Sequence, residues 1–381
     1  MENKLFDVYS KYALTINSSK GCYLFDKQGK EYIDLYGGHG VISIGHSHPH
    51  YVETLKKQLD KIVFYSNSIE MPLQEELAEK LTTISGYINY SLFLCNSGAE
   101  ANENALKLAS FKTGKKSVIA FNNSFHGRTA AAINVTYNQK IAAPINNNNF
   151  PVYFLELNDE QTFIETIQKE DIAAVIIEGI QGVGGLDMPS ESFLQLIEKE
   201  CKKNDVVLIL DEIQSGYGRT GQFFAHQHAG IKADLITIAK GMGNGFPIGG
   251  VLISPDFEAK KGILGTTFGG NHLACAAAIA VLDVIKKENL IENAAKMGSY
   301  FQNTLKDIDG IVKIKGKGLM MGTELAFPIS NLRNSILFNH GIFTGNSDNP
   351  NVIRILPPLN VTTKEIDLFL KAFQMELAPI L

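Results

Sequence analysis

The chain has 381 residues, of which 45% are hydrophobic and 20% are charged, and its formal net charge is -5. This length allows a large core and more than one domain, and the composition is that of an ordinary globular protein. The acidic balance offers no basic surface to nucleic acid or to an anionic membrane, so we expect neither as a partner.

The spacing of the cysteines and the length of the apolar runs indicate the cellular compartment of the protein. Cys22, Cys95, Cys201 and Cys275 are scattered without metal-ligand or CxxC spacing, and the chain starts with charged residues. We therefore expect reduced thiols and a cytoplasmic protein. The longest apolar run, Leu273 to Leu282, is shorter than the roughly 20 residues that cross a bilayer. It is predicted to be a core helix.

The N-terminal region combines an amphipathic segment, 1–16, with a predicted hairpin over 21–35 that turns at 26–29. The stretch that follows, GGHGVISIGHSHPH, contains the histidines His39, His46, His48 and His50. No cysteine or carboxylate completes a zinc ligand set there, so we expect no metal. The glycines favour a loop near a bound ligand.

Helices are predicted over 51–61 and 72–84, the second with Pro72 in its first turn. A strand over 92–95 then leads into NSGAEANENALKLAS, which has helical spacing of small apolar residues. Ser97 and Glu100 fit a capping box, and the free N–H groups of a helix start also fit a phosphate. The two interpretations are compatible because they use the same donors.

Strands and helices continue to alternate further along the chain. Strands are predicted over 117–121, 173–177 and 206–210, and a helix over 191–203, while 146–149 is predicted to be an exposed loop. This alternation indicates right-handed crossovers and a parallel sheet, which is an α/β architecture.

Two buried strands, 206–210 and 235–239, run directly into Asp211 and Lys240. Residues beyond the carboxyl ends of parallel strands line the ligand crevice, so the carboxylate and the amine are expected to face one ligand. Pyridoxal phosphate fits, because a lysine forms its Schiff base and a carboxylate keeps its pyridine nitrogen protonated. Otherwise, Asp211 caps a turn and Lys240 is an ordinary solvated lysine.

The motifs DEIQSGYGRTG (211–221) and AKGMGNGFPIGG (239–250) resemble the pyridine-nitrogen and Schiff-base motifs of the class III (ω-amino acid) aminotransferases. From about Gly21 to Leu359, the order of motifs is similar to that of the acetylornithine and succinylornithine aminotransferase branch. The resemblance implies fold type I, an α/β fold with a mixed, mostly parallel seven-stranded sheet in a large domain over 67–260. It implies a smaller α+β domain from 1–66 and 261–381.

The resemblance also assigns roles to residues at matching positions. Lys240 and Asp211 would be catalytic, and the cofactor would be bound by Ser97, Gly98, Ala99, Phe125, His126, Asp211, Gln214, Lys240 and Thr267. Thr267 would reach the phosphate in the partner subunit, so we expect a homodimer with shared sites. Arg128, Glu178 and Arg354 would bind substrate. Without the resemblance, Phe125 would be a core residue, Arg128 a surface residue and Thr267 a helix cap.

The chain departs from the family pattern in the loop EGIQGVGG, where Gly179 replaces a proline and Val183 replaces a glutamate. In the family that glutamate pairs with the arginine that matches Arg354 and masks it during reaction with the ω-amine. A buried guanidinium without a partner is costly. We therefore expect another anion, from the protein or a ligand, to pair with Arg354.

The implied function is transfer of the δ-amine of an Nα-acylated ornithine, acetyl or succinyl, to 2-oxoglutarate with pyridoxal 5'-phosphate as cofactor. Another ω-aminotransferase, with ornithine, 4-aminobutyrate or a polyamine as donor, stays open because of Val183. A same-fold aminomutase or racemase and a catalytically inactive binding protein are further alternatives.

Overall fold

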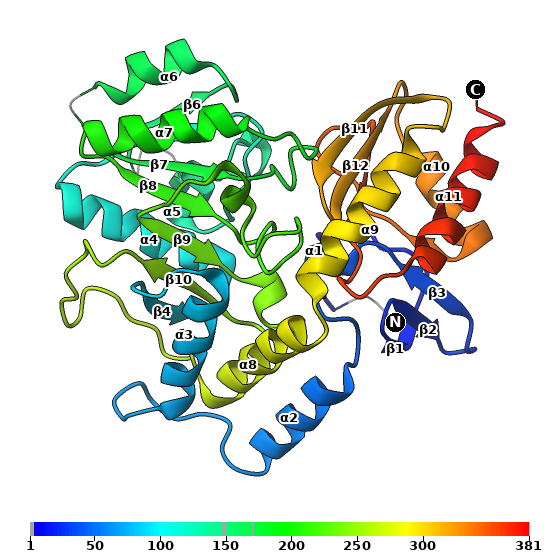
Figure 1. Ribbon diagram of the computed structural model, residues 1–381, viewed down its shortest axis with the longest axis horizontal. Helices are drawn as coiled ribbons and strands as arrows, with labels where there is room; N and C mark the ends of the chain where they lie inside the picture. The colour runs from blue at the N-terminus through cyan, green and yellow to red at the C-terminus, as the bar shows by residue number, and fades with distance from the viewer. Residues whose placement is uncertain (1–3, 147–149, 170, 381) are drawn as a thin grey trace.

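The computed structural model describes residues 4–146, 150–169 and 171–380. The chain forms a larger part built on one wide sheet and a smaller part that combines both ends of the chain (Figure 1). Part of the predicted loop over 146–149 lies outside the described residues. Asn146 itself ends a short 3-10 helix, η2 (Pro144–Asn146).

The larger part contains a seven-stranded sheet in the order β4-β10-β9-β8-β7-β5-β6. Only β10 runs antiparallel to its neighbours, so the sheet is mixed and mostly parallel. This confirms the predicted α/β fold class. The strands are β4 (Ser91–Cys95), β5 (Ser117–Phe121), β6 (Val152–Leu155), β7 (Ile172–Glu178), β8 (Val207–Asp211), β9 (Leu235–Ile238) and β10 (Gly249–Ile253).

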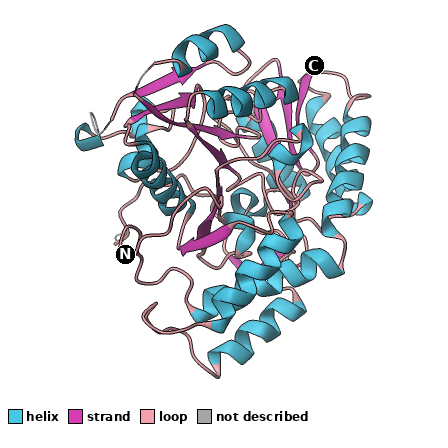
Figure 2. Ribbon diagram, turned by 60° about the vertical axis from the view of Figure 1, so that its left-hand side comes forward, coloured by secondary structure: helices cyan, strands magenta, loops and turns pink. Residues whose placement is uncertain are grey.

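Helices cover both faces of this sheet, which explains why its central strands are apolar throughout (Figure 2). On β8, Ile209 belongs to the cluster that packs on α4 (Gly98–Thr113), whereas Leu210 belongs to the cluster that includes α7 (Glu191–Lys203). The remaining elements of this part are α5 (Ala130–Asn134), α6 (Glu160–Ile167), η1 (Gln139–Ile141), η3 (Ala225–Ala229) and η4 (Lys240–Met242).

The smaller part contains two sheets, ordered β1-β2-β3-β13 and β11-β12-β14. The predicted hairpin is confirmed, because β2 (Tyr23–Asp26) pairs antiparallel with β3 (Glu31–Asp34). Its other elements are β1 (Ile16–Lys20), β11 (Ile311–Lys317), β12 (Met320–Leu325), β13 (Ile342–Phe343), β14 (Val352–Ile355), α9 (Leu290–Leu305), α10 (Ser330–His340) and α11 (Thr363–Leu377). Both ends of the chain contribute, while the domain boundaries near residues 67 and 260 stay a prediction.

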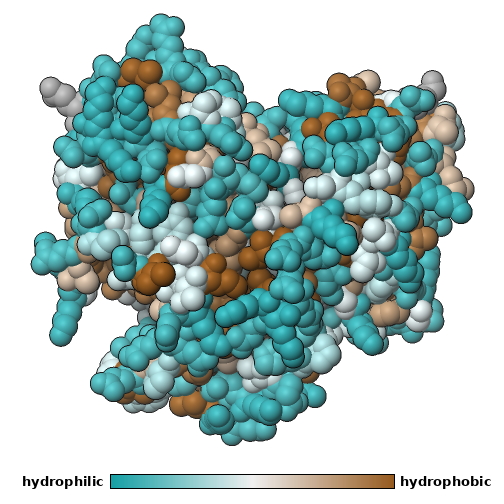
Figure 3. All heavy atoms as spheres, in the orientation of Figure 1, coloured by the Kyte–Doolittle hydropathy of each residue, from teal (hydrophilic) through white to brown (hydrophobic). Residues whose placement is uncertain are grey.

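The long apolar run forms α8 (His272–Lys287), which is buried along most of its length and packs on α2 (Pro49–Leu59) and α3 (Pro72–Ser85). The prediction of a core helix is therefore confirmed. Among the described residues, no helix is long and apolar enough to span a membrane. The face in Figure 3 is covered mainly by hydrophilic side chains, with smaller hydrophobic areas between them.

Candidate active site

The carboxyl ends of β7, β8 and β9 carry the polar side chains that the sequence singles out. β7 ends at Glu178 and β8 at Asp211, and these residues pair across the sheet, while Lys240 begins η4 just beyond β9. A cavity of about 450 Å³ lies at this edge. Most of the predicted site residues line it, namely Ser97, Gly98, Ala99, Phe125, His126, Arg128, Glu178, Asp211, Gln214 and Lys240.

The Asp211 carboxylate is buried and fixed by donors on its protein side. Its Oδ2 accepts hydrogen bonds from Asn102 Nδ2 (2.8 Å) and lies 2.7 Å from His126 Nδ1, and its Oδ1 accepts one from Ile213 N (3.0 Å). Asn102 was not predicted. Its signal is a polar residue beside Ala101 on the otherwise apolar buried face of α4.

Lys240 has an environment that favours a neutral amine. Burial lowers the pKa of its amine, although the Asp211 and Glu178 carboxylates act in the opposite direction. In the described part of the chain, neither a hydrogen bond nor an ion pair holds this amine. Its backbone has a φ of 42°, a left-handed conformation that is uncommon for a residue with a side chain. The lowered pKa increases the share of the deprotonated amine, which is the nucleophilic form of lysine.

The start of α4 has the predicted serine cap. The Glu100 side chain, however, accepts from Asn96 N and so does not complete the predicted capping box, while the phosphate interpretation stays a prediction. Ser97 Oγ accepts a hydrogen bond from Glu100 N (3.2 Å), so Ser97 is the helix cap. Gly98 and Ala99 follow it in the first turn, where backbone N–H groups have no partner within the helix. These groups lie in the cavity lining and suit an anion. A Cβ at Gly98 would lie 2.8 Å from the Ile213 side chain, so the close approach requires glycine.

Glu178 bonds to the backbone of the cavity wall. Its carboxylate accepts hydrogen bonds from Phe125 N (3.0 Å) and Gly182 N (2.8 Å). Burial raises the pKa of Glu178 to about 7; the Asp211 charge adds to this shift and His126 opposes it. The carboxyl group therefore holds the Phe125 segment in place beside the cavity.

Two buried polar atoms at the cavity have no partner among the described residues, Gln214 Oε1 and His126 Nε2. The Gln214 amide is oriented by its Nε2, which donates to His39 O (2.9 Å). A Cβ at Gly182 would lie 2.0 Å from Gln214 Oε1, so the tip of Gln214 fills the space beside this glycine. Both atoms are buried by the protein alone, so a ligand could pair with them only after these side chains move.

The two predicted arginines occupy different environments. Arg128 is exposed in the cavity lining, and within residues 4–146, 150–169 and 171–380 its guanidinium has no ion-pair partner. Arg354 is buried and lies outside the lining. It donates from Nη1 to Gly182 O (2.6 Å), from Nη2 to the Tyr36 hydroxyl (2.6 Å) and from Nε to Asn346 O.

Among the described residues, no protein carboxylate takes the place of the missing glutamate at Arg354, and pairing with a bound anion stays a prediction. All its acceptors are neutral oxygens, and no carboxylate forms an ion pair with it. Burial lowers the pKa of Arg354 from its usual high value. Backbone carbonyls and a hydroxyl satisfy its donors without neutralising its charge.

Thr267 is exposed and does not line the cavity of its own chain. Its neighbour Thr266 accepts a hydrogen bond from Asn96 Nδ2 (3.2 Å), and Asn96 lies in the lining. The histidines of the N-terminal stretch pair with acids: His46 Nε2 lies 2.7 Å from Asp34 Oδ2, and His48 Nε2 lies 2.9 Å from Glu288 Oε1.

These features fit pyridoxal phosphate. Among the described residues, the cavity is lined by an amine without a partner, a buried carboxylate at a second strand end and the backbone N–H groups of a helix start. A carboxylate suits a protonated ring nitrogen, and the donors of the α4 start suit a phosphate.

Comparison with known proteins identifies a family of aminotransferases. Residues 7–377 match the family described as aminotransferase class-III. The acetylornithine aminotransferases of Archaeoglobus fulgidus and Bacillus subtilis are each 41% identical to the chain, covering 95% and 96% of it and 95% of their own lengths.

Solved structures agree. An ornithine aminotransferase from Toxoplasma gondii, whose active site has partial occupancy of pyridoxal phosphate, superimposes with a TM-score of 0.90 at 28% identity over 99% of this chain and 92% of its own. The acetylornithine aminotransferase of Elizabethkingia anophelis gives a TM-score of 0.84 at 30% identity over 98% of this chain and 96% of its own.

Proposed function

Because the chain belongs to the class-III aminotransferases and is a pyridoxal-phosphate-dependent transaminase, we propose that it moves the δ-amine of an Nα-acylated ornithine to 2-oxoglutarate. The names of its relatives support this donor. The observation that carries the proposal is the position of Arg128. Its unpaired guanidinium shares the cavity with Lys240 and can hold a donor carboxylate away from the amine that reacts.

When bound, the cofactor supplies an electron sink for the carbon that carries the amine. Lys240 would hold the cofactor through its amine, and as a free amine it would move the proton at the donor carbon. The lowered pKa of this amine supports both roles. Asp211 faces the ring nitrogen with a charge fixed by its donors.

The remaining cavity residues orient the cofactor and the substrates. Ser97, Gly98 and Ala99 bind the phosphate, Gln214 the ring hydroxyl, and Phe125 packs on the ring, while His126 positions Asp211. Arg128 binds the donor carboxylate, and Arg354 binds the α-carboxylate of 2-oxoglutarate after leaving its present acceptors. Glu178 would contact substrate from the cavity wall, whose backbone it supports through Phe125 and Gly182.

The proposed assembly is a homodimer in which Thr267 completes the phosphate site of the partner subunit. Its exposure and its position outside the cavity of its own chain support this. Phe268, the residue after Thr267, is a large exposed apolar side chain. Val63, Phe64 and Tyr65, in a segment distant in the sequence, are exposed as well. The Phe64 and Phe268 rings lie 5.4 Å apart, so these segments form one apolar surface. The cytoplasmic location stays a prediction.

A second candidate is transfer from free ornithine, which the likeness to ornithine aminotransferase structures favours. The experiment is to add N-acetylornithine, N-succinylornithine, ornithine, 4-aminobutyrate and glutamate separately to the protein loaded with pyridoxal phosphate. We expect one acylated ornithine to convert the visible absorbance band of the bound cofactor to that of its amine form. Conversion by free ornithine at a higher kcat/KM than by either acylated donor would contradict the proposal.

A further inference from the structure

Arg354 is held in a position withdrawn from the cavity. Only 4% of its surface is exposed, and its Nη1 donates to the carbonyl of Gly182, whose backbone lines the cavity. The guanidinium therefore lies behind the Gly182 segment. To bind a carboxylate in the cavity, Arg354 must give up at least one of its present acceptors.

The residue that supplies the side-chain acceptor is Tyr36, which is 318 positions away in the sequence. The Tyr36 hydroxyl accepts from Arg354 Nη2 (2.6 Å), and its ring centroid lies 5.4 Å from Arg354 Cζ. Both contacts concern the same guanidinium. The ring contact is a cation–π interaction, which adds to the hydrogen bond.

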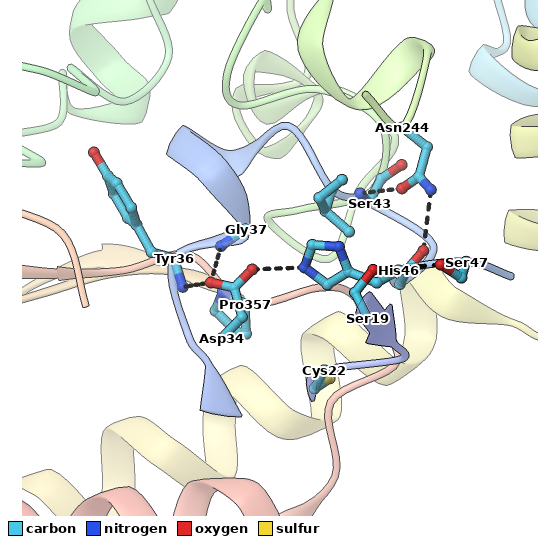
Figure 4. A network of polar contacts seen from close by, with 12 residues as sticks. Ser19, Cys22, Asp34, Tyr36, Gly37, Ser43, His46, Ser47, Asn244 and Pro357 are labelled. Carbon is cyan, nitrogen blue, oxygen red and sulfur yellow. Dashed lines mark hydrogen bonds and ion pairs between the residues drawn. The ribbon is translucent and has the colours of Figure 1, made fainter. Parts of the chain in front are cut away.

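The backbone around Tyr36 is fixed independently of Arg354. Asp34 Oδ1 accepts hydrogen bonds from Tyr36 N (3.0 Å) and Gly37 N (2.8 Å), while its Oδ2 lies 2.7 Å from His46 Nε2. Figure 4 shows this network, with the Tyr36 ring pointing away from it. The backbone of Tyr36 is therefore held in place by Asp34, while its hydroxyl accepts a hydrogen bond from Arg354.

At the place of the family's glutamate stands Val183, which has no polar side-chain atom. Its carbonyl accepts from Asp348 N (2.9 Å), which links this loop to the segment that supplies Asn346 O to Arg354. Neutral oxygens thus hold Arg354 from both sides. Among the described residues no carboxylate forms an ion pair with the guanidinium, and the charges of Glu178 and Asp348 act on it only from a greater distance.

We propose that Tyr36 is a specificity-determining positioning residue, whose neutral hydroxyl holds Arg354 back from the cavity and releases it to the carboxylate of the amino acceptor. The inference rests on the proposed function in taking a dicarboxylate as acceptor. A neutral hydroxyl competes with an incoming carboxylate less strongly than a glutamate does, because hydrogen bonds between two charged groups are the stronger ones. Affinity for the acceptor is then set by the fraction of molecules in which Arg354 is released.

The test compares Tyr36→Phe with the unchanged protein, both loaded with pyridoxal phosphate. Phenylalanine keeps the ring and removes only the hydroxyl. The matched control is Tyr32→Phe, which removes a hydroxyl bonded to Asp26 in the same sheet. The probe is glutarate, a dicarboxylate that cannot react, and its dissociation constant is measured by titration calorimetry.

We expect Tyr36→Phe to bind glutarate about 3- to 10-fold more tightly, because one hydrogen bond that favours the withdrawn position is lost. Tyr32→Phe should bind glutarate as the unchanged protein does. Unchanged or weaker binding by Tyr36→Phe would overturn the proposal, as would a lack of glutarate binding by the unchanged protein.

A second variant changes the other side of the guanidinium and leaves Tyr36 in place, so it can be measured alone even where Tyr36→Phe does not fold. Val183→Glu offers Arg354 a carboxylate, and we expect it to weaken glutarate binding at least tenfold. Where Tyr36→Phe folds, Val183→Glu is also added to it. Val183→Glu should weaken glutarate binding by a larger factor in Tyr36→Phe than in the unchanged protein, because the new carboxylate then has no hydroxyl to compete with. Glutarate binding unaffected by Val183→Glu, or strict additivity of the two changes, would count against the proposal.

These readouts separate the inference from the proposed function. Conversion of the cofactor band by the acylated donor tests the proposed substrate and Arg128, whereas the glutarate affinity tests Tyr36 and Arg354. Failure of every acylated donor in all proteins would refute the proposed substrate, while the glutarate comparison would still test Tyr36.

Discussion

His126 and Asp211 form a buried pair in which Nδ1 and Oδ2 lie 2.7 Å apart. Asn102 Nδ2 and Ile213 N also donate to this carboxylate. A carboxylate has about four lone-pair sites, so these three donors leave roughly one free. The protein therefore fixes the charge of Asp211 and leaves it able to accept one more proton donor from the cavity.

Asp211→Asn keeps the shape of this side chain and removes its charge. We expect the rate of the donor half-reaction to fall about 100- to 1,000-fold, equivalent to about 3–4 kcal/mol, as when a preorganised electrostatic group is lost. Stopped-flow absorbance with the best donor measures it. The control is Asp256→Asn at an exposed position. A half-reaction within threefold of the unchanged protein would remove Asp211 from the site.

Lys240→Ala should abolish turnover while leaving the protein folded and able to bind the cofactor without a covalent bond. The left-handed backbone at Lys240 strains lysine and alanine alike, so the substitution tests the amine rather than the backbone. Borohydride reduction followed by peptide mass spectrometry should find the cofactor on Lys240 in the unchanged protein and in the control Lys260→Ala. Substantial transamination by Lys240→Ala would disprove the assignment.

The central sheet could be predicted from the sequence because β5, β7, β8 and β9 are apolar runs with helices or loops between them. β10 was missed, since it opens with Gly249 and Gly250 directly after a proline-containing loop and so lacks a strand pattern. α6, α10, α11, β6 and β11 were also missed. β6 is an apolar run too short to distinguish a strand from a buried helix segment, whereas α11 does carry a sequence signal, the capping box of Thr362 and Glu365.

Most of the site residues could be predicted because they lie in short sequence motifs. Contacts between residues that are distant in the sequence could not be predicted. The loss of the glutamate at Val183 was visible, but the use of Tyr36 in its place depends on a contact between β14 and the segment after β3. Likewise, Asn102 becomes meaningful only when α4 is placed beside β8. Spacing along one segment carries no information about such pairs.

Glu178 predicts a pH dependence of stability in the cofactor-free protein. Its folded pKa, raised to about 7, lies above the ordinary value of 4.5, so the folded state binds more protons between these values. The contribution of Glu178 to stability is then complete below about pH 4.5 and lost as the pH rises through about 7. The loss is on the order of 3 kcal/mol.

The measurement is urea unfolding at a series of pH values from 5 to 8. Glu178→Gln cannot titrate, so we expect its unfolding free energy to fall less over this range, even though glutamine bonds the two backbone N–H groups less well. Glu258→Gln, at an exposed position, should keep the slope of the unchanged protein. Equal slopes for all three proteins would show that Glu178 is ionised throughout.

The proposed sharing of sites between subunits predicts complementation between two defective chains. If Thr267 acts in the partner subunit, a heterodimer of Thr267→Ala and Lys240→Ala contains one site with an intact Lys240 and an intact partner threonine. We expect Thr267→Ala alone to bind the cofactor about tenfold more weakly, as for one lost hydrogen bond to a charged group. Lys240→Ala alone should be inactive.

Refolding the two variants together, with a different tag on each chain, allows the heterodimer to be purified. At limiting pyridoxal phosphate, its activity per dimer should be about half that of the unchanged protein, because one of its two sites is restored. If Thr267 instead served its own chain, every site with Lys240 would lack the threonine, and the heterodimer would need as much cofactor as Thr267→Ala does. A monomer by sedimentation velocity would also exclude action across subunits.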